Sequence, residues 1–159
     1  MNDIKIENVL FKETTVLDID TFPDKDSLFQ YLSGVLFESG NITSQGLFLK
    51  ALYEREEEGS TYMGEEIAVP HGKSDAVTTP CVAICRVQTP FDYVSNDEVG
   101  PVRLVFMLAV PSSGASTLHL SMLAKLSRML VHEEFIAQLL QARNFSEVLQ
   151  AFQDCEASL

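Results

Sequence analysis

The chain has 159 residues, and its 11 Lys and Arg residues against 23 Asp and Glu residues give a formal net charge of −12 at pH 7. A hydrophobic fraction of 46% with 21% charged residues is ordinary for a globular protein and excludes disordered and fibrous classes. The charge argues against a surface that binds nucleic acid or an anionic membrane, because nothing would neutralise the phosphates, but it suits a basic protein partner. At this length we expect one domain over residues 1–159.

The first third of the chain predicts one strand followed by two helices. Residues 14–19 form a short run rich in β-branched residues, which is typical of a strand. Residues 23–26, with one proline and two aspartates, are typical of a helix N-terminus, and apolar residues then recur at helical spacing until Gly40. A second helix is expected from near Thr43, through a charged stretch, to Gly59. A loop follows over residues 60–66.

The rest of the chain predicts strands and then helices. A brief apolar run over residues 67–69 is broken by Pro70-His71-Gly72, and residues 81–87 form a predicted strand. Residues 102–110 are almost unbroken apolar, as in a central strand that is covered on both faces. Helical spacing then predicts three helices, over residues 118–131, around residues 135–140, and from near residue 146. This order indicates an α/β fold with a mixed or mostly parallel sheet between helices.

The cysteines and the N-terminus bear on the compartment. Cys81 and Cys85 are spaced C-x3-C inside an apolar run, and Cys155 lies near the end, which fits neither a disulfide framework nor a zinc pair. We interpret them as core residues. The chain has no apolar stretch of about 18 residues and no export signal, so we expect a reduced, cytoplasmic protein without membrane insertion.

Two familiar sites are excluded by spacing. Gly72-Lys73-Ser74 resembles the end of a phosphate-binding loop, but the first glycine that such a loop needs is replaced by Ile67. His132-Glu133 begins like a metalloprotease helix, but the second ligand position holds Ile136. His132 is therefore expected to lie in solvent at the start of a helix.

The other two histidines fall where an open α/β sheet collects functional groups, beyond the carboxyl ends of strands. His71 directly follows a short apolar run, and His119 begins the helix after the central strand. A histidine near neutral pH is a good nucleophile when a hydrogen bond to one ring nitrogen orients the other. Metal binding by both histidines with a carboxylate is the rival hypothesis, but it lacks a compact ligand spacing.

If the histidine attacks a phosphoryl group, the site must supply donors and cations to stabilise the charge. The candidates are Gly72, Lys73, the amides near His119, and Arg55. Arg55 and Lys73 also have simpler interpretations, as a surface ion pair and as a solvated turn residue.

Two blocks of sequence carry a resemblance to a known family. The first is the stretch Glu54-Arg55-Glu56, Gly59-Ser60-Thr61 and Ala68-Val69-Pro70-His71-Gly72, and the second is His119-Leu120 with the leucines that follow. Together they resemble the fructose/mannitol-type IIA component of the bacterial phosphoenolpyruvate-dependent sugar phosphotransferase system. The similarity extends from the strand at Thr14 to the helix at Phe152.

The resemblance implies a function and a set of roles. His71 would accept phosphate from the histidine phosphocarrier protein and pass it to a IIB domain, which is itself linked to a membrane IIC permease. His119 would hydrogen-bond the phosphoryl group and Arg55 would neutralise its charge. The family fold is a mixed, mostly parallel five-stranded sheet flanked by helices on both faces, and it works in the cytoplasm without a metal or other cofactor.

Two other functions stay open on the sequence. One is a regulatory module of this type, nitrogen-related or associated with a transcription regulator, that is phosphorylated as a signal and serves no permease. The other is a catalytically silent ligand-binding domain, which the paired histidines disfavour.

Overall fold

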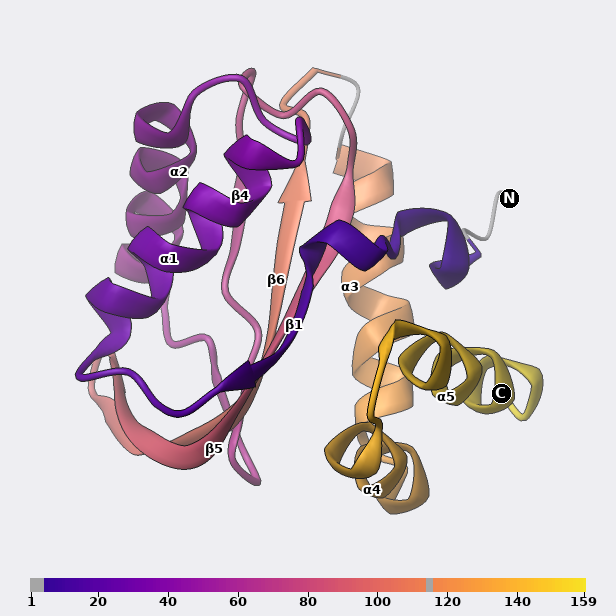
Figure 1. Cartoon of the computed structure of the whole chain (residues 1–159). Coiled ribbons are helices and arrows are strands. Elements are labelled where there is room, and N and C mark those ends of the chain that lie inside the picture. The colour runs from indigo at the N-terminus through magenta and orange to yellow at the C-terminus, as the bar shows by residue number, and fades with distance from the viewer. Residues whose placement is uncertain (1–4, 114–115) are drawn as a thin grey trace.

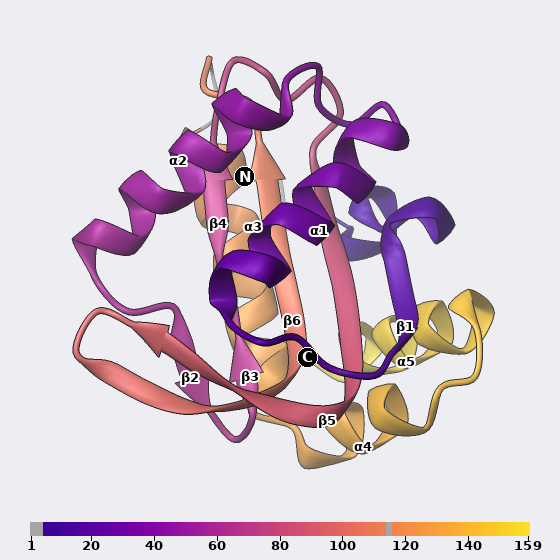
Figure 2. The same ribbon diagram turned by 60° about the vertical axis from the view of Figure 1, so that its left-hand side comes forward.

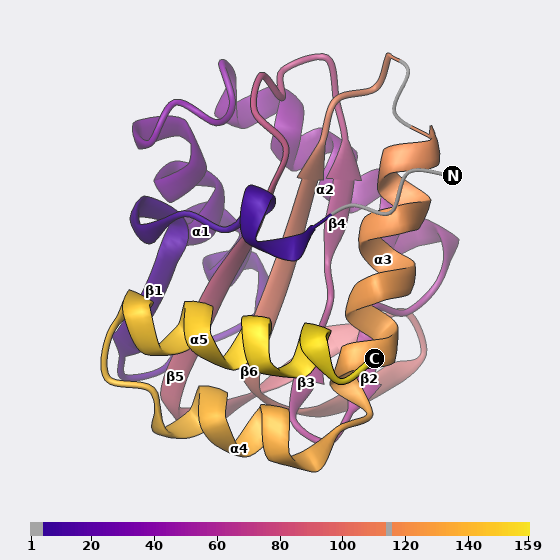
Figure 3. The same ribbon diagram turned by 90° about the vertical axis from the view of Figure 1, so that its right-hand side faces the viewer.

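One mixed β-sheet lies between two layers of helices in the computed structural model, which describes residues 5–113 and 116–159 (Figure 1). Helices α1 (Lys25–Glu38) and α2 (Gln45–Glu58) cover one face. Helices α3 (Ser116–Leu130), α4 (Glu133–Gln141) and α5 (Phe145–Ala157) cross the other face (Figure 3). The expected α/β sandwich is confirmed.

The helices begin where short polar side chains cap them. Asp24 accepts a hydrogen bond from the backbone N–H of Ser27 before α1, and Ser44 accepts one from Leu47 before α2. Such caps satisfy amides that have no partner inside the helix. Two short 3-10 helices precede α1, η1 (Ile6–Val9) and η2 (Lys12–Thr14), and the sequence analysis did not predict them. No helix within residues 5–113 and 116–159 is long and apolar enough to cross a membrane.

Among the described residues the sheet contains six strands: β1 (Thr15–Ile19), β2 (Tyr62–Gly64), β3 (Ile67–Ala68), β4 (His71–Lys73), β5 (Cys81–Ser95) and β6 (Glu98–Val110). Three pairings are parallel, β1 with β5 and both β3 and β4 with β6. The pairings of β2 with β3 and of β5 with β6 are antiparallel. Because β3 and β4 pair with successive parts of β6, they form one strand interrupted at Val69-Pro70, and the six strands then count as the expected five.

Two predicted boundaries were wrong, both at tight turns. Strands β5 and β6 form one long hairpin with Ser95 opposite Glu98, where the sequence analysis predicted two shorter strands over residues 81–87 and 102–110. The predicted loop over residues 60–66 contains β2, which turns into β3 through Glu65 and Glu66 at φ 54° and 64°. Two-residue hairpin turns need such left-handed residues, and glutamates carry no glycine or asparagine signal to reveal one.

The core has one part on each face of the sheet, because successive side chains of β6 alternate between the faces. Phe106 and Leu108 pack with α3 and α5, and Val105 and Met107 pack with α1 and α2. This confirms the predicted central strand. Cys81 and Cys85 are fully buried in the second part, and burial raises the pKa of each thiol to about 12, so both are core residues as expected.

Candidate functional site

The candidate site lies where α2 and α3 flank the strand β4 (Figure 2). His71 is the first residue of β4 and lies opposite Leu108 of β6. We expected His71 just beyond the end of a strand, and this was wrong, because the strand resumes after the interruption at Pro70. His71 nevertheless lies near the carboxyl end of β6, which ends at Val110, and α3 with His119 follows that strand in the chain.

Hydrogen bonds to both ring nitrogens orient the His71 side chain, which is only 5% exposed. Its Nδ1 lies 3.0 Å from the carbonyl oxygen of Val69, and its Nε2 lies 3.0 Å from Nε of Arg55. A carbonyl can only accept and a guanidinium can only donate. The neutral tautomer that satisfies both bonds therefore carries its proton on Nδ1 and a lone pair on Nε2.

Arg55 reaches His71 from the last turn of α2. Its Nη1 donates to the carbonyl oxygen of Gly59 at 2.9 Å, while its Nε donates to His71. The simpler interpretation, a surface ion pair, therefore does not describe these contacts. The guanidinium is fixed at the ring nitrogen that carries the lone pair.

His119 lies beside His71, with the two ring centroids 4.9 Å apart and the rings tilted by 39°. Its Nε2 is buried and has no hydrogen-bond partner among the residues that the structure describes. Burial lowers the pKa of His119, and electrostatic interactions with His71, Lys73 and Arg55 lower it further. A buried polar atom without a partner is costly, so this nitrogen is suited to meet a ligand atom.

The pKa of His71 is lowered below its usual value of 6.5, chiefly because burial disfavours the charged ring. The carbonyl of Val69 raises this pKa and the charge of Arg55 lowers it, so the net direction follows burial. The ring is consequently neutral at pH 7. A neutral ring keeps the Nε2 lone pair available as a nucleophile.

We expect reaction at His71 to be independent of pH above 6.5 and to fall as the pH drops through its lowered pKa, because protonation occupies the Nε2 lone pair. The stability that the neutral ring contributes is lost over the same range. An NMR titration of the His71 ring nitrogens, compared with single-turnover rates, tests this expectation. A midpoint above pH 6.5 for His71 would contradict it.

Gly72 lets α2 approach β4 closely. A Cβ at Gly72 would lie 3.2 Å from Cβ of Ala51, 3.2 Å from a ring carbon of Phe48 and 3.3 Å from the backbone nitrogen of Leu52. These distances are tighter than ordinary contacts, so α2 with Arg55 would have to shift away from His71. The missing side chain thus sets the spacing of the site.

Gly72→Ala is expected to destabilise the protein by about 1–3 kcal/mol, the usual cost of overpacking, and to slow any reaction that needs Arg55 at His71. Urea unfolding measures the first effect. Gly46→Ala, in the helix α2 that packs on Gly72, is the matched control, because a Cβ there meets no atom within 4 Å. Equal stabilities of the two variants would show that the close approach at Gly72 is tolerant.

Within residues 5–113 and 116–159, no three His, Cys, Asp or Glu side chains are arranged to hold a metal ion. The site is instead built from two imidazoles, a guanidinium and a nearby lysine. His132 lies exposed at the N-cap of α4 and makes no capping hydrogen bond with its side chain, as expected of a solvated helix-start residue.

The sequence analysis missed two contributors to the site. One is the backbone carbonyl of Val69, which the sequence cannot indicate because every residue type has the same carbonyl. The other is Glu56, which lies in a run of charges but is only 6% exposed. Its spacing was the available signal, because Phe48, Leu52 and Glu56 recur every four residues on the buried face of α2.

The fold and the site define an α/β protein with a neutral, oriented histidine at a position suited to an anionic group. The chain belongs to the family described as phosphoenolpyruvate-dependent sugar phosphotransferase system, EIIA 2, whose model matches residues 8–155. Members of this family are phosphotransferase components of sugar transport systems, so the expected family membership is confirmed.

Three similar proteins illustrate the range of the family. The fructose-specific EIIA component of Haloferax volcanii is 37% identical over 76% of this chain and 77% of its own length. The fructose-specific EIIABC component of Bacillus subtilis is 35% identical over 92% of this chain, which spans only 22% of that relative. The crystal structure of the nitrogen regulatory protein IIA-Ntr from Neisseria meningitidis matches with a TM-score of 0.80 and 28% identity, covering 92% of this chain and 98% of that one.

Proposed function

We propose that this protein accepts a phosphoryl group from the histidine phosphocarrier protein on Nε2 of His71 and passes it to a IIB domain. The observation that carries the proposal is the pair of hydrogen bonds at His71. The carbonyl of Val69 accepts a hydrogen bond from the proton on Nδ1, and Arg55 donates one to the lone pair on Nε2. The attacking atom is thereby selected before the donor arrives.

In the transfer step, the Nε2 lone pair of His71 forms a bond to phosphorus while the P–N bond to the donor histidine breaks. The donor ring keeps the electron pair of that bond, and the proton of His71 stays on its Nδ1, where it is hydrogen-bonded to the carbonyl oxygen of Val69. Onward transfer repeats the exchange, with a nucleophile of the IIB domain as the attacking group. No metal or further reactant is needed for the balance.

The transferred group brings negative charge to a protein of net charge −12, so the site must stabilise it locally. Arg55 would turn its Nε from the ring nitrogen to a phosphoryl oxygen while Gly59 still holds Nη1. His119 would donate from Nε2, the buried nitrogen without a described partner. Lys73 adds positive charge, as its effect on the pKa of His119 indicates.

The IIB domain is proposed as the acceptor because the relative in Bacillus subtilis is named as an EIIABC component. A second candidate function is a regulatory one, in which the phosphorylated protein is a signal and serves no permease. The similarity to the nitrogen regulatory protein IIA-Ntr of Neisseria meningitidis favours this alternative. Both functions begin with the same step at His71.

Intact mass spectrometry tests the proposal and separates the two candidates. The protein is mixed with phosphoenolpyruvate, enzyme I and the phosphocarrier protein, and then with IIB domains of fructose and mannitol type. We expect one phosphoryl group to be gained and then lost to a IIB domain. Gain without loss to any IIB domain would favour the regulatory function, and no gain at all would overturn the proposal.

A further inference from the structure

Glu56 anchors a buried polar network next to the site. Its carboxylate accepts hydrogen bonds from Nζ of Lys25 at 2.9 Å, from the hydroxyl of Ser95 at 2.6 Å and from the hydroxyl of Thr61 at 2.5 Å. Its backbone carbonyl accepts a further bond from the side-chain amide of Asn96. The carboxylate joins three segments that are far apart in the sequence: α1, the segment after α2, and the end of β5.

The same network fixes the segment between α2 and β2. The hydroxyl of Ser95 donates to Glu56 and also accepts the backbone N–H of Thr61 at 2.9 Å. The hydroxyl of Thr61, in turn, lies 2.7 Å from that of Tyr93. Both the backbone and the side chain of Thr61 are therefore tied to groups that contact Glu56 or lie beside it.

From Thr61, backbone hydrogen bonds lead to the reactive ring. The carbonyl of Thr61 accepts the N–H of Val69 at 2.9 Å, and the carbonyl of Val69 lies 3.0 Å from Nδ1 of His71. On the other side, Gly59, two residues before Thr61, holds Arg55 against Nε2. Both partners of the His71 ring thus depend on residues 59–61.

We propose that Glu56 is a positioning residue that, through Thr61 and Val69, holds His71 in the tautomer with its proton on Nδ1. This deepens the proposed function and rests on it for its consequence in catalysis. Glu56 contacts neither ring nitrogen. Its charge raises the pKa of His71 from a distance, and its effect on the tautomer is transmitted by the placement of the Val69 carbonyl. A carboxylate suits this role because it can accept three donors at once.

The sharpest test variant is Thr61→Val combined with Ser95→Ala, which removes both the side-chain and the backbone link of residue 61 to the carboxylate and keeps the pair of Glu56 with Lys25. Glu56→Gln removes the charge and tests the anchor itself. The first readout is the tautomer of His71 in the unphosphorylated protein, from the ¹⁵N shifts of its ring. The second is the single-turnover rate of phosphoryl acceptance.

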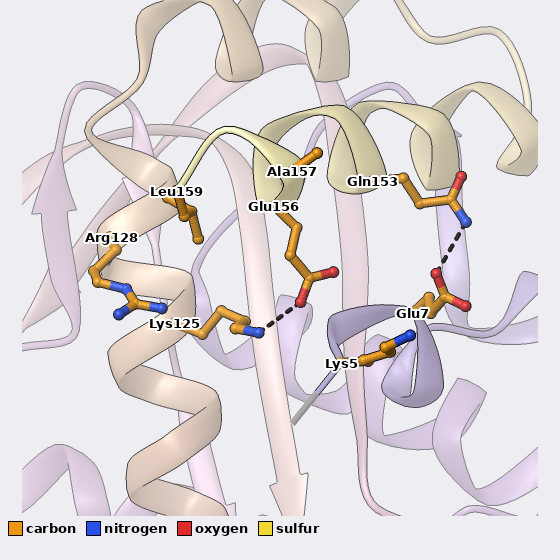
Figure 4. Close-up of a pocket in the computed structure, with 8 residues that line it drawn as sticks. All are labelled: Lys5, Glu7, Lys125, Arg128, Gln153, Glu156, Ala157 and Leu159. Atoms are coloured by element: carbon orange, nitrogen blue, oxygen red, sulfur yellow. Dashed lines mark hydrogen bonds and ion pairs between the residues drawn. The ribbon is translucent and has the colours of Figure 1, made fainter. Parts of the chain in front are cut away.

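We expect both variants to lose the uniform Nδ1–H tautomer and to accept phosphate about tenfold to a hundredfold more slowly, as for a misplaced reacting group. The matched control is Glu156→Gln, which breaks an ion pair between a glutamate and a buried lysine elsewhere in the fold. Lys125 and Glu156 lie 2.5 Å apart between α3 and α5 (Figure 4), and no residue of that pair belongs to the path to His71. This control is expected to lose stability and to keep the wild-type tautomer.

Wild-type tautomer and rate in the folded double variant, Thr61→Val with Ser95→Ala, would overturn the proposal, and Glu56 would then only stabilise α2. If Glu56→Gln does not fold, the double variant still decides the question, because it leaves the buried charge paired with Lys25. The tautomer needs no phosphocarrier protein for its measurement. Failure of the proposed function, seen as wild type that never accepts phosphate, is therefore distinguishable from failure of this inference.

Discussion

His71→Ala is expected to abolish phosphoryl acceptance, because the variant lacks the only ring nitrogen that Val69 and Arg55 prepare for attack. Intact mass after incubation with the donor system measures acceptance. The wild-type adduct should be labile in acid and stable in base, as expected for a phosphorus–nitrogen bond. An acid-stable adduct would point to a serine or threonine instead.

The fold of this variant needs its own check, since His71 is largely buried and its removal leaves space beside α2. His71→Gln fills more of that space and should behave the same way in the mass assay. His132→Ala, at the exposed start of α4, serves as the control and should accept phosphate normally. Stoichiometric labelling of a folded His71 variant would refute the assignment.

His119→Ala is expected to accept phosphate on His71 but to do so on the order of a hundredfold more slowly or worse, the usual cost of losing one donor that stabilises developing charge. The buried Nε2 of His119 has no described partner in the resting protein, so its contribution should appear only when a phosphoryl group is present. Rapid-quench kinetics of acceptance and of onward transfer measure the effect.

The same observation predicts that the stability of this variant changes little, since the substitution removes a buried polar atom rather than a hydrogen bond between described residues. His119→Gln is the informative companion, because its amide can donate from a similar position and should restore part of the rate. If acceptance and onward transfer by His119→Ala both match wild type, His119 does not stabilise the phosphoryl group, and the proposal of a site with two histidines is wrong.

The sequence by itself determined the class of fold, and it predicted three site residues, His71, His119 and Arg55, which the structure brings together. The almost unbroken apolar run of β6 predicted a strand covered on both faces, and the helical spacing on either side in the sequence predicted the helices that cover it. These are local patterns, in which side-chain chemistry and spacing carry the information. The motif around His71 was likewise readable, because the residues that the resemblance used are contiguous in the chain.

Tertiary structure decided which ring nitrogen of His71 carries the proton and which carries the lone pair. The proton position depends on the carbonyl of Val69, and every residue type has the same carbonyl, so the sequence holds no sign of it. The burial of Glu56 was hidden for another reason. Its donors come from Lys25, Thr61 and Ser95, and only the packing of α1 and β5 against α2 brings them together. A charge in a charged run is buried only where such distant partners converge.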